Sequence, residues 1–478
     1  MTTAIHPGEI WRQARPVASV GIIGGGLAGL AAGCALADAG YAVTIFERKP
    51  YLGGRASSYE LPATGEVVDN CQHVLLGCCT NLIDLYKRLG VEQKVRWYDR
   101  LTFIEPGGRS GELSSSAMPA PFHSASSFLA YPLLSMPDKL GVARAMMPLM
   151  RGIPSDGGDF LSWLRRHGQT RRAIDRFWAP VLVSALNDDL DRVSVRYGAM
   201  VFREAFLKSA EAGRMGVPTV PLSELYGVAA DYITARGGEV LLRCSVEQVS
   251  PEPGRVVVKG AAGEREFDHA ISAVPFHAVP KLFAGDDRGA LADQLSELRT
   301  VPITGIHLWF DREITGLEHA VLLDRTIQWM FQKSKILERN GPGGPAGAGS
   351  YLELVVSSSK TLLDKPRGEI LELALRELAE FFPSAREARL LKGTVVKEVH
   401  ATFSPAPGSD PARLSPVTRW PRLLLSGDWT DTGWPATMEG AVRAGYRTAE
   451  VLARQAGRPQ RFLVPDLPAR GLMKLFPA

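Results

Sequence analysis

Two short apolar runs near the N-terminus flank a segment of small residues. Residues 17–23 form a β-rich apolar run that is followed by three consecutive glycines. Residues 27–39 are small or favour helix, and a glycine follows them, as is common at a helix C-terminus. A second apolar run covers residues 42–46 and ends at Glu47. This order predicts strand, turn, helix and strand, which is the βαβ unit.

The pattern farther along the chain alternates between helical and strand periodicity. Helices are expected over residues 160–166, 174–186, 225–236, 369–382 and 437–455. Strands are expected over residues 240–242, 246–249, 270–274, 306–311, 351–356 and 423–425, with a hairpin that pairs 255–258 with 266–269. Residues 341–350 are rich in Gly, Pro and Ala and predict a mobile loop.

Strands that fit the first unit recur near the start, the middle and the end of the chain. We therefore expect an α/β fold with two discontinuous domains. A Rossmann-like nucleotide-binding domain is expected from residues 15–90, 218–280 and 420–458. A discontinuous α+β substrate domain is expected from residues 91–217 and 281–419, and residues 459–478 form a C-terminal tail.

The glycines of the first turn have the spacing of a dinucleotide-binding motif. Gly24-x-Gly26-x-x-Gly29 lies between the strand and the helix, and Glu47 follows 18 residues after Gly29. The first glycine permits the turn, the second admits a pyrophosphate, and the third lets helix and strand pack closely. Glu47 suits ribose hydroxyls, and we include the adjacent Arg48 among the expected cofactor-binding residues.

Composition and charge exclude several classes of protein. The chain has 478 residues with 55 Lys and Arg against 51 Asp and Glu, and it has no basic tract, so nucleic acid is not an expected partner. Five cysteines, an odd number, fit a reducing compartment better than a disulfide framework. Residues 1–16 do not resemble a signal peptide, and no apolar run of about 18 residues occurs. We expect a cytoplasmic protein.

Motifs at both ends of the chain resemble those of FAD-dependent amine oxidases and carotenoid desaturases. The first is Gly53-Gly54-Arg55, and the second is Gly427-Asp428 with the Met-Glu-Gly run that starts at residue 438. The resemblance implies that Arg55 lies against the flavin pyrophosphate, together with Gly54, and that Asp428, next to Gly427, binds a ribityl hydroxyl.

The same resemblance assigns roles to three further positions. Thr437 and Met438 begin the helix that faces the flavin N1 and C2=O edge, where reduction places negative charge. Val246 matches the position whose backbone contacts adenine. Since no second Gly-x-Gly-x-x-Gly motif follows a strand, the expected cofactor is FAD rather than NAD, which makes the first domain FAD-binding.

Four local runs narrow the resemblance to the hydroxysqualene dehydroxylases of hopanoid biosynthesis. These runs cover residues 68–77, 176–180, 401–405 and 433–440. Cys71 stands where the subgroup has glycine, and Thr437 stands where amine oxidases carry a tyrosine of their aromatic cage. The resemblance implies a reductive removal of the allylic hydroxyl of hydroxysqualene, which gives squalene, with electrons from an external donor.

Departure of hydroxide requires a proton donor or a strong hydrogen bond. His73 is the first candidate for this donor, and its alternative role is a histidine satisfied by backbone carbonyls. Gln72 is a second candidate that could orient flavin or substrate. We expect no metal, because Cys71, His73, Cys78 and Cys79 lack the paired spacing of structural zinc sites.

Two other functions remain open at this point. The first is a polyprenoid or carotenoid desaturase or oxidase, which runs the hydride in the opposite direction on the same scaffold. The second is a non-catalytic prenyl-lipid binder. The presence of Arg55, Gly427 and Asp428 argues against the binder, because a protein without flavin has no need of residues for a ribityl chain.

A C30 isoprenoid substrate resides in the membrane, so we expect peripheral association with its inner face. Residues 122–150 are rich in Phe, Leu and Met but contain three prolines, so they cannot form one spanning helix. They form either a membrane-facing lid or ordinary core of the substrate domain. The tail, residues 459–478, is a second candidate for membrane contact.

Overall fold

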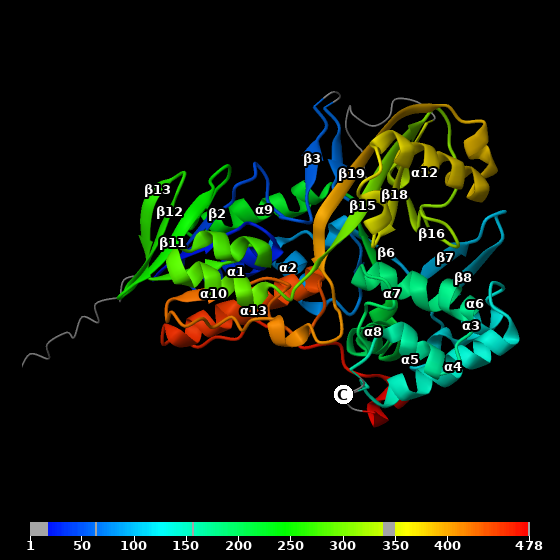
Figure 1. The fold of residues 1–478 in the computed structure, drawn as a ribbon, viewed down its shortest axis with the longest axis horizontal. Helices are drawn as coiled ribbons and strands as arrows, with labels where there is room; N and C mark the ends of the chain where they lie inside the picture. The colour runs from blue at the N-terminus through cyan, green and yellow to red at the C-terminus, as the bar shows by residue number, and fades with distance from the viewer. Residues whose placement is uncertain (1–17, 63–64, 155–156, 338–348, 477–478) are drawn as a thin grey trace, which may run out of the picture.

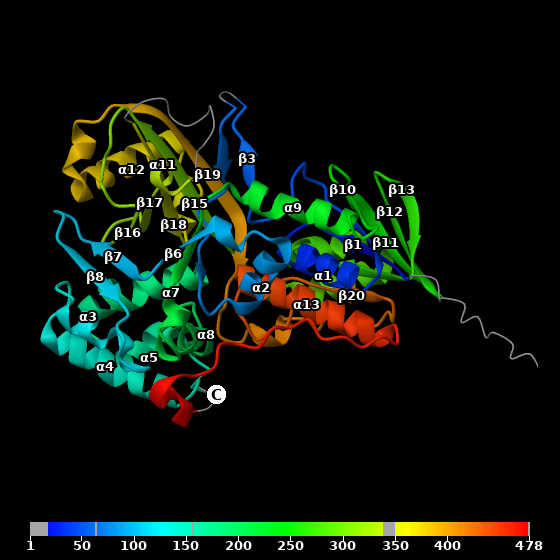
Figure 2. The same ribbon diagram turned by 180° about the vertical axis from the view of Figure 1, so that it is seen from behind.

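The chain folds into two lobes with the C-terminal end of the chain beneath the second (Figures 1 and 2). The computed structural model describes residues 18–62, 65–154, 157–337 and 349–476. The loop expected at residues 341–350 lies outside the described residues except for its last two positions. In the part of the chain that is described, no helix has both the length and the apolar character needed to cross a bilayer.

A five-stranded parallel sheet forms the centre of the first lobe. Its order is β10-β2-β1-β14-β20, and the strands come from three separate stretches of the chain. The bounds are β1 (Ser19–Ile23), β2 (Ala42–Phe46), β10 (Glu239–Leu241), β14 (His269–Ser272) and β20 (Leu423–Leu425). The strands carry near-continuous apolar runs because both faces of a parallel sheet are buried. This sheet confirms the expected Rossmann-like α/β fold.

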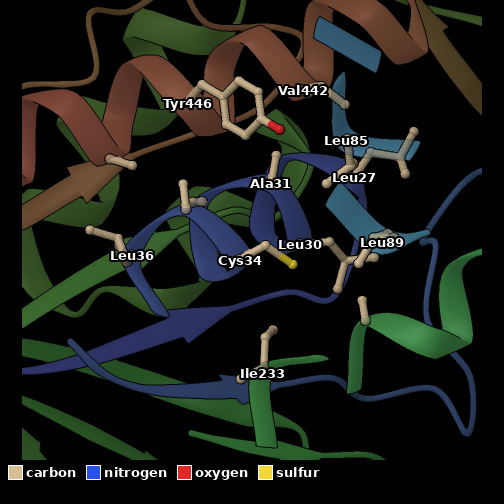
Figure 3. Packing of buried hydrophobic residues seen from close by; sticks show 14 of the residues in the cluster. Leu27, Leu30, Ala31, Cys34, Leu36, Leu85, Leu89, Ile233, Val442 and Tyr446 are labelled. Carbon is tan, nitrogen blue, oxygen red and sulfur yellow. The ribbon is translucent and has the colours of Figure 1, made fainter. Parts of the chain in front are cut away.

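Helices cover the sheet and make the main core of this lobe. They are α1 (Leu27–Asp38), α2 (Thr80–Leu89), α9 (Leu222–Thr234) and α13 (Met438–Gln455). The helix α10 (Gly285–Leu295) packs in a separate cluster with Val249 and Val256. Leu30 and Cys34 of α1 pack among Leu85 of α2, Ile233 of α9 and Tyr446 of α13 (Figure 3). The helices α1 and α13 approach closely, since a Cβ on Gly445 would lie 2.3 Å from the backbone oxygen of Ala28.

A three-stranded antiparallel sheet, β11 (Val246–Glu252), β12 (Arg255–Gly260) and β13 (Gly263–Phe267), extends from this lobe. The prediction that residue 269 belongs to the hairpin is wrong, because His269 pairs with Val20 in the parallel sheet. The side chain of Asp268 accepts hydrogen bonds from the backbone N–H and the hydroxyl of Ser19 at 2.8 and 2.9 Å. That contact turns the chain from the hairpin into β14.

A seven-stranded sheet of order β19-β15-β18-β17-β16-β7-β8 forms the second lobe. The bounds are β7 (Arg100–Ile104), β8 (Ser110–Ser114), β15 (Thr300–Phe310), β16 (His319–Leu322), β17 (Trp329–Gln332), β18 (Ser350–Ser357) and β19 (Leu390–Phe403). The helix α12 (Arg367–Phe381) packs on one face, and the short helix α11 (Lys333–Ile336) follows β17. The long β19 reaches from this sheet toward the first lobe (Figure 1).

Short strands lie near the junction of the lobes, and short helices pack together beneath the second lobe (Figure 1). The strands are β3 (Ser58–Glu60), β4 (Val67–Asp69), β5 (Leu75–Leu76), β6 (Val95–Tyr98) and β9 (Met215–Pro218). The helices are α3 (Ala125–Ala130), α4 (Met136–Arg151), α5 (Phe160–Arg166), α6 (Arg171–Ala173), α7 (Ala179–Leu186) and α8 (Val195–Val201). The π-helical turns η3 (Ile174–Trp178) and η4 (Phe202–Leu207) continue α6 and α8, so the helix predicted over residues 174–186 contains a π-helical start.

Candidate functional site

One cavity of about 890 Å³ runs between the lobes and is lined by both. Its first end is lined by the glycine turn after β1 and by the residues that follow β20. Its second end is apolar and is lined by side chains of the second lobe and of the helices beneath it. Representative apolar residues there are Leu101, Phe103, Val181, Met200, Phe206, Met215, Val321, Trp329, Phe331 and Val355.

The glycine turn places the N-terminus of α1 at the first end of the cavity. Gly26 precedes the helix, has no side chain to cap it, and lines the cavity with Gly24 and Leu27. A Cβ built on Gly26 would meet only Gly54, at 3.8 Å, so this glycine keeps the backbone open to a ligand. Gly29 instead packs inward, since its Cβ would lie 2.0 Å from the backbone oxygen of Gly24. The first-turn N–H groups are therefore available to an anion such as a pyrophosphate.

Glu47 and Arg48 lie beside this turn. The Glu47 carboxylate accepts hydrogen bonds from the backbone N–H groups of Gly25 at 2.8 Å and Lys49 at 2.7 Å. These contacts fix the carboxylate at the cavity wall, next to Arg48 and Val246. A carboxylate has about four acceptor sites, so capacity remains for ribose hydroxyls.

Arg55 and Asp428 connect distant parts of the chain at the first end of the cavity. Arg55 Nη2 lies 2.5 Å from Asp428 Oδ1, and Nη1 donates to the backbone oxygen of Ala401 at 2.9 Å. Asp428 is buried and Gly427 lines the cavity beside it. The expected pyrophosphate arginine and the expected ribityl carboxylate are thus in direct contact.

Two histidines near this ion pair were not singled out in the sequence. The rings of His277 and His400 are 4.6 Å apart, and both line the cavity. Burial lowers the pKa of His277 to about 4, with a further contribution from His400. His277 follows a predicted strand and Pro275, so a histidine after a Rossmann strand is the signal that could have found it.

The N-terminus of α13 also faces the cavity. Thr437 Oγ1 accepts a hydrogen bond from the backbone N–H of Gly440 at 3.0 Å and so caps the helix. Met438 lines the cavity, and its sulfur accepts a hydrogen bond from the Tyr226 hydroxyl at 3.4 Å. The partial positive charge of this helix end suits the negative charge that a reduced flavin carries.

His73 and Gln72 line the cavity, and both are held by protein contacts. His73 Nδ1 lies 2.9 Å from the backbone oxygen of Cys71, which leaves Nε2 as the ring nitrogen for proton exchange with a ligand. Burial lowers the pKa of His73. Gln72 Nε2 donates to the backbone oxygen of His73 at 3.0 Å, and its Oε1 accepts from Lys333 Nζ at 2.7 Å.

Lys333 belongs to a buried ionic cluster that the sequence did not indicate. Its ammonium lies 2.8 Å from Asp69 Oδ2 and 3.5 Å from Glu353 Oε2. Burial lowers the pKa of Lys333, but Asp69 and Glu353 outweigh burial and the net effect raises that pKa. Burial raises the pKa of Glu353 to about 7, against the opposing effect of Lys333. The cluster joins β4, α11 and β18 beneath the residues that carry Gln72 and His73.

A comparison with models of protein families identifies the family of this chain. The family described as "Flavin containing amine oxidoreductase" matches residues 27–453. This chain belongs to that family. FAD is therefore the cofactor of this protein.

Curated relatives agree with this assignment, and solved structures share the fold. The chain is similar to a zeta-carotene desaturase of Zea mays, with 29% identity over 93% of this chain and 85% of the relative. It is also similar to a 15-cis-phytoene desaturase of Synechococcus elongatus, with 28% identity over 92% of this chain and 98% of the relative. An oxidoreductase structure from Methanosarcina mazei, 18% identical, superposes with a TM-score of 0.68 over 89% of this chain and 98% of that one. The cyclohexylamine oxidase of Brevibacterium oxydans, 19% identical, superposes with a TM-score of 0.64 over 93% of this chain and 100% of that one.

The residues at the first end fit FAD in this flavoprotein. The open backbone at Gly26 and the uncapped start of α1 suit the pyrophosphate. Glu47 suits the adenosine ribose, and Asp428 suits the ribityl chain. Arg48 and Arg55 add positive charge along the same wall. The flavin supplies two-electron hydride chemistry when it is bound.

Proposed function

We propose that this flavoprotein is an oxidoreductase of long isoprenoids, and specifically that it removes the allylic hydroxyl of hydroxysqualene to give squalene. The observation that carries the proposal is the apolar second end of the cavity, which is continuous with the cofactor end. A long hydrocarbon fits such walls because burial of apolar surface is its main source of binding energy. The four local runs that resemble hydroxysqualene dehydroxylases supply the specific substrate.

The overall reaction consumes one hydride, one proton and the alcohol, and it releases squalene and water. The carbon–oxygen bond breaks, a carbon–hydrogen bond forms at the same carbon, and the reduced cofactor is oxidised by two electrons. An external donor must then reduce the cofactor again. The chain's own residues therefore have to bind the hydrocarbon, exclude bulk water and hold a proton near the departing oxygen.

His73 is the group proposed to hold this proton. The contact between Nδ1 and the oxygen of Cys71 orients the ring and leaves Nε2 for the departing hydroxyl. Because burial lowers the pKa of His73, the imidazolium is a stronger acid than usual when it forms, but it is less populated at neutral pH. Gln72 is proposed as a positioning residue, since both ends of its amide are bonded to the protein.

A second candidate function is desaturation of a polyprenoid. It is favoured by the identity to proteins named for zeta-carotene and phytoene desaturation. In this direction the substrate loses hydride and a proton, and oxidised cofactor is consumed. The same cavity serves both reactions, so only the direction of electron flow separates them.

An anaerobic single-turnover experiment tests the proposal. Photoreduced protein mixed with hydroxysqualene should regain its oxidised flavin absorbance and form squalene in equal amounts. Oxidised protein mixed with phytoene should remain oxidised. Bleaching of the flavin by phytoene, without reoxidation by hydroxysqualene, would establish the desaturase instead. No change in either mixture would favour the non-catalytic prenyl-lipid binder.

A further inference from the structure

Large apolar side chains gather on one exposed region beneath the second lobe. Most of the exposed large hydrophobic residues in the described ranges lie either in residues 118–153 or in the last turn of the tail. We call this region the apolar face. Its members are Met118, Phe122, Leu129, Met136, Leu140, Met147, Ile153, Leu472 and Leu475. A region of this kind marks an interaction surface, because monomeric soluble proteins rarely expose contiguous apolar patches of large size.

The helix α4 presents one stripe of the apolar face. Met136, Leu140 and Met147 are exposed, and the exposed Arg144 and Arg151 fall at the intervening helical positions. The successive spacings are four, four, three and four residues, which places all five on one side of the helix. Such a stripe, with arginines among apolar side chains, is typical of a helix that lies in a membrane interface.

The tail joins this region rather than forming a separate one. The 3₁₀ turn η10 (Gly471–Leu475) buries Met473 among residues of α4, and the N–H of Leu472 donates to the oxygen of Ala120 at 2.9 Å. A Cβ on Gly471 would lie 2.4 Å from that same oxygen, so the turn fits closely. The two segments that the sequence predicted as candidates for membrane contact are therefore neighbours, and α4 and the tail lie side by side at the bottom of Figures 1 and 2.

The charges on the apolar face are positive. Residues 113–153 contain a single acidic residue, Asp138, and it is buried, where it accepts hydrogen bonds from Ser135 and Thr170. Arg144 and Arg151 are exposed, as are Arg470 and Lys474 of the tail. Positive charge around exposed apolar side chains complements anionic lipid headgroups.

One helical layer separates the apolar face from the cavity. Met200 and Ala205 of the α8–η4 run line the cavity. Arg203 of the same run points to the other side, where it donates to the backbone oxygens of Met150 at 2.6 Å and Phe476 at 2.5 Å. Arg203 therefore fixes the end of α4 and the end of the tail against the cavity wall.

We propose that the apolar face docks on an anionic lipid bilayer and places the apolar end of the cavity over the membrane. The substrate part of this proposal rests on the proposed function, whereas docking itself does not. The tail acts as a strap that completes the docking surface, held by Arg203 and by the backbone contact to Ala120.

Vesicle flotation without substrate tests docking independently of the reaction. The holoprotein should float with vesicles of phosphatidylglycerol and phosphatidylcholine. The double variant L140E/M147E should partition at least about tenfold more weakly, because two exposed apolar contacts are replaced by charges of the wrong sign. For the variant R144Q/R151Q, the partition coefficient on these vesicles should fall about fivefold for each arginine removed. On vesicles of pure phosphatidylcholine it should hardly change.

A matched control is available elsewhere on the surface. Leu391 is 58% exposed and Val417 is 52% exposed, against 66% for Leu140 and 52% for Met147, and both lie outside the apolar face. The variant L391E/V417E should float like the wild type. Loss of flotation by this control, or no flotation of the wild type, would overturn the proposal. A wild-type dimer in sedimentation velocity that L140E/M147E dissociates would also overturn it, because the occupant would then be a second copy.

Discussion

The cofactor end of the cavity and the segment of residues 69–74 are built on different principles. The cofactor end uses backbone: the glycine turn, the uncapped start of α1 and the start of α13 offer N–H groups, and few side chains are required. The 69–74 segment uses side chains from remote positions, since Gln72 and Asp69 are held by Lys333. The comparison teaches that each motif of the FAD site is encoded by neighbouring residues and acts largely through its backbone, whereas the candidate chemical step depends on side chains that long-range contacts hold.

The substitution Lys333→Met should have the largest effect on stability. It leaves the carboxylate of Asp69 buried without its cation, and breaking a buried ion pair in this way costs about 3–5 kcal/mol. The free energy of unfolding, measured with a chemical denaturant, should fall by that amount. Lys335→Met, in the same helix but partly exposed, should change it by less than about 1 kcal/mol. Equal losses of unfolding free energy in the two variants would contradict the prediction that the buried cluster contributes more to stability than an ion pair at the surface.

The contrast also explains which parts of the molecule the sequence could predict. The βαβ unit, the glycine turn and Glu47 lie within about thirty residues, so their spacing can be recognised in the sequence itself. The cluster of Asp69, Lys333 and Glu353 joins Asp69 to residues more than 260 positions farther along the chain. A contact over such a separation leaves no periodic pattern in the sequence. A single sequence shows these residues only as separate charges, and only Glu353 lies between two apolar neighbours.

Strands show the same limit. The five strands of the parallel sheet were anticipated because each is a short apolar run. The fourteen-residue β19 was not, because its residues are only half-buried and polar side chains interrupt the apolar pattern. Its pairing with β15 and the contact of Ala401 with Arg55 decide its place, and both are tertiary.

The pH dependence of stability tests the charge state of the cluster. The pKa of Glu353 in the folded protein is about 7, above its usual value, so the folded state keeps a proton that the unfolded state releases. Stability should therefore fall as pH rises from about 4.5 to 7, and the penalty should be complete above pH 7. Glu353→Gln should reduce the loss of unfolding free energy between pH 5 and pH 8 by about 3 kcal/mol.

The matched control for this measurement is Glu372→Gln, at an exposed position of α12. It should leave the pH dependence of the wild type unchanged. A wild-type profile as flat as that of Glu353→Gln would mean that Glu353 is ionised in the folded protein at all these pH values.

The substitution His73→Ala tests whether the 69–74 segment takes part in proton transfer. Loss of a general acid should reduce single-turnover reoxidation by hydroxysqualene about a hundredfold, with the flavin absorbance unchanged. Because burial lowers the pKa of His73, the wild-type rate should rise as pH falls toward that pKa, and the variant should lose this dependence. Unchanged turnover would leave His73 as a histidine satisfied by the oxygen of Cys71.

The smallest expected effect is at the cofactor end, where Arg55→Lys keeps the charge but removes the planar pair of donors. Arg55 now binds Asp428 and the oxygen of Ala401 through two different nitrogens, which a single ammonium cannot reproduce. The FAD dissociation constant, measured by titrating the apoprotein, should rise about tenfold, which is about 1.4 kcal/mol. Arg255→Lys, on the remote β12 hairpin, should leave it unchanged. Since backbone N–H groups supply most of the cofactor site, a loss far above tenfold would show that this end also depends on a side-chain network, and the contrast with the 69–74 segment would fail.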